Sequence, residues 1–277
     1  MGNKKYSVLM SLYYKENPEF LKLSVESMLN QSVKPDQIVI VKDGKLTEEL
    51  DKVVEYYISM EPSLFTVVAL DKNLGLGLAL NEGLKRCRNE LVARMDTDDI
   101  SVKDRCKLQV EEFLKDKKLS IVGSMINEFY DNPNNIVSSR IVPTKHEDIL
   151  KFSRRRSPFN HPTVMYKKSE VLGCGGYHDV KRKEDIDLFG RMLNQGYIAM
   201  NIDKPLLLFR SNEDNYKRRK SWSNCKSYIS VIYDFWKKGY SGTSDLLIVI
   251  IGQIVMFLSP VWLLKILSNK FLRVRTK

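Results

Sequence analysis

Three carboxylates fall within four positions in the segment Asp96–Asp99, directly after a short apolar run. Side chains alternate along an extended segment, so Asp96 and Asp98 point to one side and Thr97 points to the other. Two like charges side by side are costly unless a cation or strong hydrogen bonds lie between them. Mg²⁺ or Mn²⁺ would meet that requirement, because hard divalent ions take oxygen ligands from carboxylates and substrate phosphates. A solvated acidic turn is the alternative interpretation, and the surrounding elements decide between it and a metal site.

The elements before this acidic cluster alternate between strand and helix. Short apolar runs predict buried strands, and apolar residues at helical spacing predict core-facing helices. The expected strands cover residues 6–12, 37–41, 64–70 and 90–95, and the expected helices cover residues 17–29, 47–60 and 78–87. This alternation predicts an α/β fold, with a mostly parallel central sheet flanked by helices.

Polar segments follow three of these four strands. Tyr13–Glu16 comes after the first strand, Asp43 and Gly44 after the second, and Asp96–Asp99 after the fourth. Ligands of such sheets bind beyond the carboxyl ends of the strands. The three segments are therefore expected to form one binding site.

Composition and charge narrow the class of protein. The 277 residues are 43% hydrophobic and 29% charged, which is typical of a folded chain with one large domain or one domain plus an appendage. The net charge of +11 concentrates in the second half. An anionic membrane surface or a phosphate-bearing substrate explains it at least as well as nucleic acid does. The four cysteines form no CxxC pair, which indicates reduced thiols in a cytosolic compartment, and no signal peptide is visible.

The end of the chain changes character. A basic helix with interleaved aromatic residues is predicted over residues 216–238, and Leu246–Leu264 is nearly all apolar. That run of about 19 residues is close to the minimum of roughly 17–20 for spanning a bilayer. Lysine and arginine flank it on both sides, whereas a simple span collects them on the cytoplasmic side. A segment lying in the membrane plane, or re-entering it, is favoured over a span and over a buried helix of the core.

Five segments follow one another along the chain, namely Ser7–Glu16, Val39–Gly44, Asn73–Gly77, Met95–Asp99 and Glu184–Phe189. In this order they resemble the motifs of the inverting family 2 glycosyltransferases with a GT-A fold. The resemblance covers about residues 5–215 and is strongest to bacterial enzymes that build surface polysaccharides or lipid-linked glycans. It implies a GT-A domain over residues 1–215, with the nucleotide-sugar half at about 1–100 and the acceptor half at about 101–215. Residues 216–277 would form the basic helix and a hydrophobic, membrane-associating tail.

The resemblance implies a nucleoside-diphosphate sugar as donor, and a UDP-sugar is the first expectation. Tyr14 and Glu16 are implied near the base, and Asp43 would accept a hydrogen bond from the uracil N–H or the ribose. Asn73–Gly77 lacks the GxGxxG spacing of a dinucleotide fold. By resemblance Asn73 lies near the nucleotide, where the glycines permit close approach.

The resemblance also implies roles for the acidic cluster. Asp98 would ligate Mg²⁺ or Mn²⁺ bridging the diphosphate, and Asp96 would contact the ribose or the metal. The ion would neutralise the charge that develops on the leaving nucleoside diphosphate. Asp99 is left without a firm role, and orienting the loop is one option.

Inversion requires a general base on the sugar face opposite the leaving group. The implied base is Asp185, with Glu184 and Asp187 at other angular positions of the same helix. Favourable charge at a helix N-terminus is the alternative explanation for this acidic pair. His161 matches a position near the acceptor or the diphosphate, but a structural hydrogen bond explains a lone histidine better.

The acceptor half gives less guidance. The Gln-x-x-Arg-Trp motif of processive members is absent, which favours transfer of a single sugar, and Arg218 or Arg219 could bind a diphosphate. The expected acceptor is a glycan or a polyprenyl-diphosphate-linked saccharide at the cytoplasmic face of the cell membrane, with no nucleic acid as partner. A nucleotidyltransferase would need a glycine-rich phosphate loop after the first strand, and Tyr13–Glu16 contains no glycine. A nucleic-acid-binding protein would have no need of Asp185.

Overall fold

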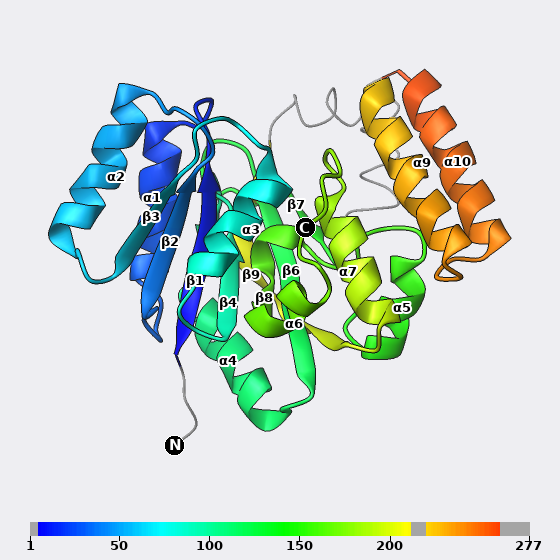
Figure 1. Ribbon diagram of the computed structural model, residues 1–277, viewed down its shortest axis with the longest axis horizontal. Helices are drawn as coiled ribbons and strands as arrows, with labels where there is room; N and C mark the ends of the chain where they lie inside the picture. The colour runs from blue at the N-terminus through cyan, green and yellow to red at the C-terminus, as the bar shows by residue number, and fades with distance from the viewer. Residues whose placement is uncertain (1–4, 212–219, 261–277) are drawn as a thin grey trace.

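The computed structural model describes residues 5–211 and 220–260 (Figure 1). Its first half follows the predicted alternation of strands and helices. The elements are β1 (Tyr6–Leu12), α1 (Pro18–Leu29), β2 (Gln37–Lys42), α2 (Glu48–Met60), β3 (Phe65–Ala69), α3 (Leu76–Arg86) and β4 (Leu91–Met95). Asn17 caps α1 as predicted, since its side chain accepts a hydrogen bond from the Glu19 N–H, and Pro18 occupies the first helical position.

The second half combines shorter elements with two long strands. They are β5 (Ile100–Ser101), α4 (Arg105–Lys115), β6 (Leu119–Phe129), β7 (Ser138–Arg140), α5 (His146–Ser153), the 3₁₀ turn η1 (His161–Thr163), β8 (Met165–Lys167), α6 (Lys168–Gly173), α7 (Glu184–Asn194), β9 (Ile198–Arg210), α9 (Trp222–Lys237) and α10 (Thr243–Leu258). The long strands β6 and β9 run parallel to each other across most of their length, with irregular register near Ser124 and Met125.

The strands form one sheet in the order β3-β2-β1-β4-β8-β6-β9-β5, with β7 paired to β6. The first four strands are parallel, as predicted. The rest of the sheet is mixed, which corrects the expectation of a mostly parallel sheet: β6 and β9 are parallel, whereas β8 is antiparallel to both β4 and β6, and β5 and β7 pair antiparallel to their neighbours. Short strands such as β5 and β8 carry too few residues to show their direction in the sequence.

Two hydrophobic layers lie on the two faces of the sheet. Val8 and Met10 of β1 belong to the layer that includes residues of α1, α2 and α4, while Leu9 belongs to the layer with α3, α6 and α7. Helix α3 lies close to the sheet because Gly83 faces Leu9 and Val41 with no side chain of its own. This close contact places the N-terminal end of α3 beside the carboxyl ends of β1 and β2.

Helices α9 and α10 lie side by side at one end of the molecule, and α1 and α2 lie at the opposite end (Figure 1). Helices α9 and α10 pack on α7 through a small cluster that includes Ile186, Phe235 and Leu246. Within residues 5–211 and 220–260, no helix combines the length and apolar character that crossing a bilayer requires. The predicted segment Leu246–Leu264 lies in α10 up to Leu258, and its end falls outside the described residues. The predicted boundary at 215/216 also falls outside them and stays a prediction.

Replacing Gly83 by alanine should destabilise the fold. The added Cβ would lie 2.4 Å from Leu9 Cδ1 and 2.5 Å from Val41 Cγ2, and overpacking of this kind costs about 1–3 kcal/mol. Gly252→Ala is the matched control, because nothing lies within 4 Å of its added Cβ and alanine favours a helix over glycine. Urea unfolding of both variants is the measurement. A Gly83→Ala protein as stable as the wild type would contradict the close packing of α3.

Candidate active site

The acidic cluster lies in the loop that follows β4, between α1 and the end of β9. One ligand oxygen from each of Asp96, Asp98 and Asp99 falls within 4.8 Å of the others. Ser24 of α1 holds the loop by donating a hydrogen bond to the Asp96 carbonyl oxygen at 2.7 Å. Asp99 is fully buried, and its Oδ1 accepts a hydrogen bond from the Arg210 N–H at 2.8 Å. Its Oδ2 has no hydrogen-bond partner among the described residues.

The crowding of these carboxylates makes their ionised forms unfavourable. Burial, followed by the charges of Asp96 and Glu16, raises the pKa of Asp98 to about 7. Burial and the neighbouring carboxylates raise the pKa of Asp99 well above its usual range. A divalent cation would relieve this repulsion, and the buried, unpartnered Asp99 oxygen with two further carboxylates is a donor set of the type that Mg²⁺ and Mn²⁺ use. The residues therefore fit such an ion.

Two arginines contact this cluster. Arg94 lies under it in β4, only 1% exposed, and its Nη2 is 2.6 Å from Asp96 Oδ1. Arg210, at the end of β9, donates from Nε to the Asp98 carbonyl oxygen at 2.9 Å. Its guanidinium stacks on Phe20 and Phe129, with distances of 3.7 and 4.6 Å to the ring centroids. Sequence reasoning missed both arginines, although an arginine inside the apolar run of β4 was a visible signal.

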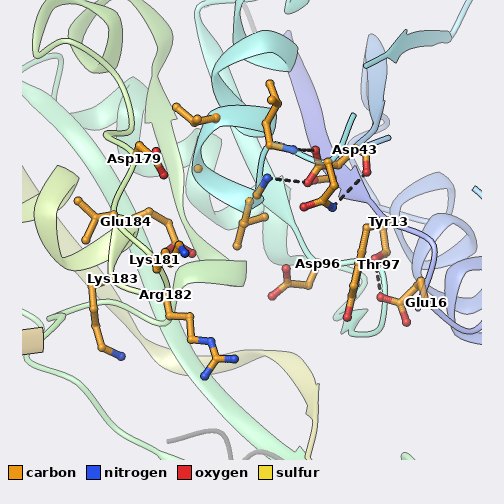
Figure 2. Close-up of a pocket in the computed structure, with 18 of the residues that line it drawn as sticks. Tyr13, Glu16, Asp43, Asp96, Thr97, Asp179, Lys181, Arg182, Lys183 and Glu184 are labelled. Carbon is orange, nitrogen blue, oxygen red and sulfur yellow. Dashed lines mark hydrogen bonds between the residues drawn. The ribbon is translucent and has the colours of Figure 1, made fainter. Parts of the chain in front are cut away.

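A pocket of about 920 Å³ opens beside the cluster. Its size falls within the range of about 300–1,000 Å³ that is usual for ligand sites. Figure 2 shows Asp43, Tyr13 and Glu16 on one side, Lys181, Arg182, Lys183 and Glu184 on the other, and Asp96 between them. The acidic residues around Asp96 and the three cations Lys181, Arg182 and Lys183 across from them suit a ligand that carries a metal-bound diphosphate.

Asp43 lines this pocket and holds the loop before α3, which lines it too. Its Oδ1 accepts a hydrogen bond from the Leu74 N–H at 2.6 Å, and its Oδ2 accepts one from the Gly75 N–H at 3.0 Å (Figure 2). The Asn73 amide in turn donates to the Asp43 carbonyl oxygen at 3.2 Å. Gly44 has a φ of +85°, and a Cβ there would lie 2.7 Å from the Asn73 backbone nitrogen, so this contact requires glycine. Asp43 thus holds the loop before α3, and each oxygen keeps a second lone pair for a ligand.

The loop after β1 places one tyrosine in the pocket and turns its neighbour away. Tyr13 lines the pocket, whereas Tyr14, the predicted residue, is not part of the lining and is half exposed. Glu16 also lines it and accepts a hydrogen bond from Thr97 Oγ1 at 2.9 Å, which joins this loop to the acidic cluster. The structure thus brings Glu16, Asp43, Asn73, Asp96 and Asp98 to one pocket, and their contacts with a donor stay predictions.

A second, smaller pocket of about 260 Å³ adjoins the first. Leu76, Asp96 and Phe209 line both pockets. Asp185, from the first turn of α7, lines the smaller pocket together with Arg94, Asn160 and His161. Asp96 therefore lies between a pocket that is also lined by Asp98 and a pocket that is also lined by Asp185, the predicted base.

The other carboxylates of α7 have different surroundings from Asp185. Asp187 is an ion-pair partner of Arg191 at 2.8 Å and lies 3.0 Å from His178 Nδ1. Glu184 is buried and lines the larger pocket, and burial, followed by the charge of Asp185, raises its pKa to about 7. Asp185 is only half-buried. Of the three, it is the carboxylate that lines the smaller pocket.

His161 makes a structural hydrogen bond, and its expected place near the acceptor or the diphosphate stays a prediction. Its Nε2 lies 3.0 Å from Tyr177 Oη, which is the structural hydrogen bond, and its ring also lines the smaller pocket. Burial, followed by the charge of Arg94, lowers the pKa of this histidine well below its usual range. A neutral imidazole is therefore expected at pH 7. Arg218 and Arg219 lie outside the described residues.

Comparison with known proteins identifies the family. The profile of glycosyl transferase family 2 matches residues 7–176, which is more than half of the chain. The chain belongs to glycosyl transferase family 2. A Haemophilus influenzae protein described as an uncharacterized glycosyltransferase of this kind is 40% identical over 269 residues, covering 97% of this chain and 99% of its own.

Another relative of this glycosyltransferase has a more specific description. The Escherichia coli UDP-Gal:alpha-D-GlcNAc-diphosphoundecaprenol beta-1,3-galactosyltransferase is 37% identical over 259 residues, covering 92% of each chain. Among solved structures, a mannosyltransferase from Pyrobaculum calidifontis, in complex with GDP-Man and Mn²⁺, aligns with a TM-score of 0.62 at 15% identity, over 96% of this chain and 74% of that one. The protein is thus a glycosyltransferase enzyme with the GT-A fold, and its sheet is mixed.

Removing the charge of Glu184 should change how the stability of this glycosyltransferase depends on pH. Because the folded pKa of about 7 lies above the ordinary value of 4.5, the folded state binds the proton more tightly, and stability falls as pH rises from about 4.5 through 7. Glu184→Gln lacks this titration, so its free energy of unfolding should gain about 1–3 kcal/mol over the wild type between pH 5 and pH 8. Urea unfolding at both pH values is the measurement. Glu48→Gln, in the exposed first turn of α2, is the control, and an equal response of the two variants would contradict the burial of Glu184.

Proposed function

We propose that this enzyme transfers a single sugar from a nucleoside-diphosphate sugar to a lipid-linked glycan, with inversion at the anomeric carbon. The observation that carries the proposal is the position of Asp96, which lines both adjoining pockets. The larger pocket offers carboxylates and cations to a donor diphosphate, and the smaller one offers Asp185 to an acceptor. A sugar that reaches past Asp96 would have its leaving group on one side and the acceptor hydroxyl on the other.

In this proposal the donor binds in the larger pocket. Asp96, Asp98 and Asp99 would hold Mg²⁺ or Mn²⁺, which when bound offsets the charge that develops on the leaving diphosphate. Lys181–Lys183 line the same pocket and attract the phosphates by charge. Arg94 fixes the Asp96 carboxylate through their ion pair at 2.6 Å. Tyr13 and Glu16 contact the nucleoside from the loop after β1, and Asp43 keeps the opposite loop in place.

In the transfer step, the general base Asp185 acts from the smaller pocket. The acceptor hydroxyl oxygen forms a bond to the anomeric carbon as the bond from that carbon to the diphosphate oxygen breaks. Asp185 takes the proton of the hydroxyl, and the electrons of the breaking bond leave with the nucleoside diphosphate. Attack from the side opposite the leaving group inverts the configuration. The neutral imidazole of His161 lies beside this space and can position the acceptor by a hydrogen bond.

The donor and acceptor follow from the relatives by analogy. A UDP-sugar is the first expectation, with galactose, glucose and their N-acetylated forms ahead of rhamnose. A polyprenyl-diphosphate-linked saccharide is the proposed acceptor, in the synthesis of a cell-surface polysaccharide. Nucleotide sugars are made in the cytosol, so the site would face the cytoplasm, with the protein peripheral on the inner leaflet. The basic second half of the chain agrees with an anionic surface there.

Loss of Asp98 should remove metal-dependent donor binding. UDP-, GDP- and dTDP-sugars are titrated calorimetrically into the wild type with Mn²⁺ present, and the tightest binder is repeated with Asp98→Ala. We expect at least a tenfold weaker donor affinity in the variant, which corresponds to about 1.4 kcal/mol. Asp104→Ala, an exposed aspartate at the start of α4, should bind as the wild type does. Unchanged donor binding by Asp98→Ala, with or without Mn²⁺, would refute the metal assignment.

A further inference from the structure

Helix α10 has an exposed apolar face that the folded core does not use. Leu246, Val249 and Gln253 are buried toward α9 and α7. The opposite side of the helix, the outer face, is apolar, and its side chains are 42–71% exposed. It consists of Leu247, Ile248, Ile251, Ile254, Val255 and Leu258. Contiguous apolar patches on soluble monomers are rarely this long and mark interaction sites. The outer face is therefore expected to be an interaction surface.

Aromatic side chains with polar atoms lie at both ends of this helix pair. Trp222 is 52% exposed, and its ring contacts Phe257 at 5.3 Å, which joins the start of α9 to the end of α10. Trp236 at the other end donates from its indole nitrogen to Thr243 Oγ1 at 3.2 Å and stacks on Tyr233 at 5.7 Å. Tryptophan and tyrosine are enriched where an apolar phase meets water, as at the level of lipid headgroups.

The charges around the outer face are mostly positive. Lys226, Lys237 and Lys238 are exposed on or beside α9. Arg155, at the end of α5, forms an ion pair with Asp245 at 2.5 Å, which brings a run of three arginines, residues 154–156, to the base of α10. Asp234 and Asp245 are the acidic residues of the segment 220–260, and the sequence beyond it adds five lysines and arginines with no acidic residue. This surrounding charge complements an anionic surface.

We propose that the outer face of α10, with the aromatic ends of the helix pair, inserts into the headgroup region of an anionic lipid bilayer. The sixteen residues of α10 make a helix about 24 Å long, shorter than the hydrocarbon core of about 30 Å. The helix therefore lies in the membrane plane, apolar side down, with lysine and arginine at its edges. A second copy of the chain would also cover an apolar face, but flanking cations on both copies would repel each other.

This surface is joined to the catalytic helix. Ile186, next to Asp185 in α7, packs in one cluster with Phe235 of α9 and Leu246 of α10. Gly190 of α7 leaves room for Phe235, whose ring atom Cζ would lie 2.2 Å from an added Cβ. Asn224 of α9 lines the larger pocket itself. Membrane docking through α10 thus holds the first turn of α7 at a fixed position relative to the bilayer, and this inference rests on the proposed lipid-linked acceptor.

Vesicle flotation tests the proposal with the full chain. The double variant Leu247→Glu/Ile251→Glu places charge on the outer face, and Leu23→Glu is the matched control, 42% exposed on α1 at the far end of the molecule (Figure 1). With phosphatidylglycerol–phosphatidylcholine vesicles, the wild type and Leu23→Glu should float. The double variant should partition at least tenfold less. Pure phosphatidylcholine vesicles should bind the wild type more weakly, and added salt should weaken binding to the anionic vesicles.

Calorimetric titration of UDP with Mn²⁺ separates this inference from the proposed function. All three proteins should bind UDP alike, which shows that the variants are folded. A double variant that floats as well as the wild type, or a wild type that does not bind anionic vesicles, would overturn the proposal. So would light scattering that shows a wild-type dimer dissociated by the same substitutions, because the occupant would then be a second copy. Loss of UDP binding in the wild type would overturn the proposed function while leaving the vesicle result to stand by itself.

Discussion

Repulsion among three carboxylates is the interaction on which the rest of the site depends. Asp96, Asp98 and Asp99 share a space in which their ligand atoms lie within 4.8 Å of one another, and Asp99 is fully buried. Arg94 and Arg210 offset part of this charge. The Asp99 Oδ2 oxygen still has no hydrogen-bond partner among the described residues, so the cluster fits a divalent ion.

The fold positions this charge by bringing strand ends together. Parallel pairing of β1, β2 and β4 sets the loops that carry Glu16, Asp43 and Asp96 at one edge of the sheet. Asp43 fixes the loop before α3, and Glu16 contacts Thr97 in the cluster. The proposed base, Asp185, comes from a different part of the chain, since α7 packs in the other hydrophobic layer and its first turn lines the smaller pocket together with Asp96.

The sequence allowed prediction of the parts that depend on local pattern. The strands and helices of the first half follow from apolar periodicity, and Asn17 followed by Pro18 marks where α1 begins. The mixed second half could not be predicted, because β8 and β9 find partners far away in the chain. Whether Tyr13 or Tyr14 lines the larger pocket depends on how one loop turns. The hydrogen bonds of Asp43 join residues about thirty positions apart, which local patterns do not reveal. Arg94 and Arg210 show the same limit: a charge inside an apolar run marks Arg94 as unusual, but the partners of both arginines follow only from the fold.

In the proposed mechanism, two different groups of carboxylates share the reaction, one in each of the pockets that Asp96 lines. The acidic cluster holds the metal that assists departure of the nucleoside diphosphate, and Asp185 removes the proton of the acceptor hydroxyl. The most direct measurement compares donor binding with turnover in Asp185→Asn. Calorimetry with Mn²⁺ and the donor sugar should give wild-type affinity, because Asp185 lines the smaller pocket and the metal-type cluster is intact. Sugar transfer by the same protein should fall by about 10²–10⁴-fold, the usual contribution of a general base. Retained turnover, or loss of donor binding together with turnover, would contradict this division of roles.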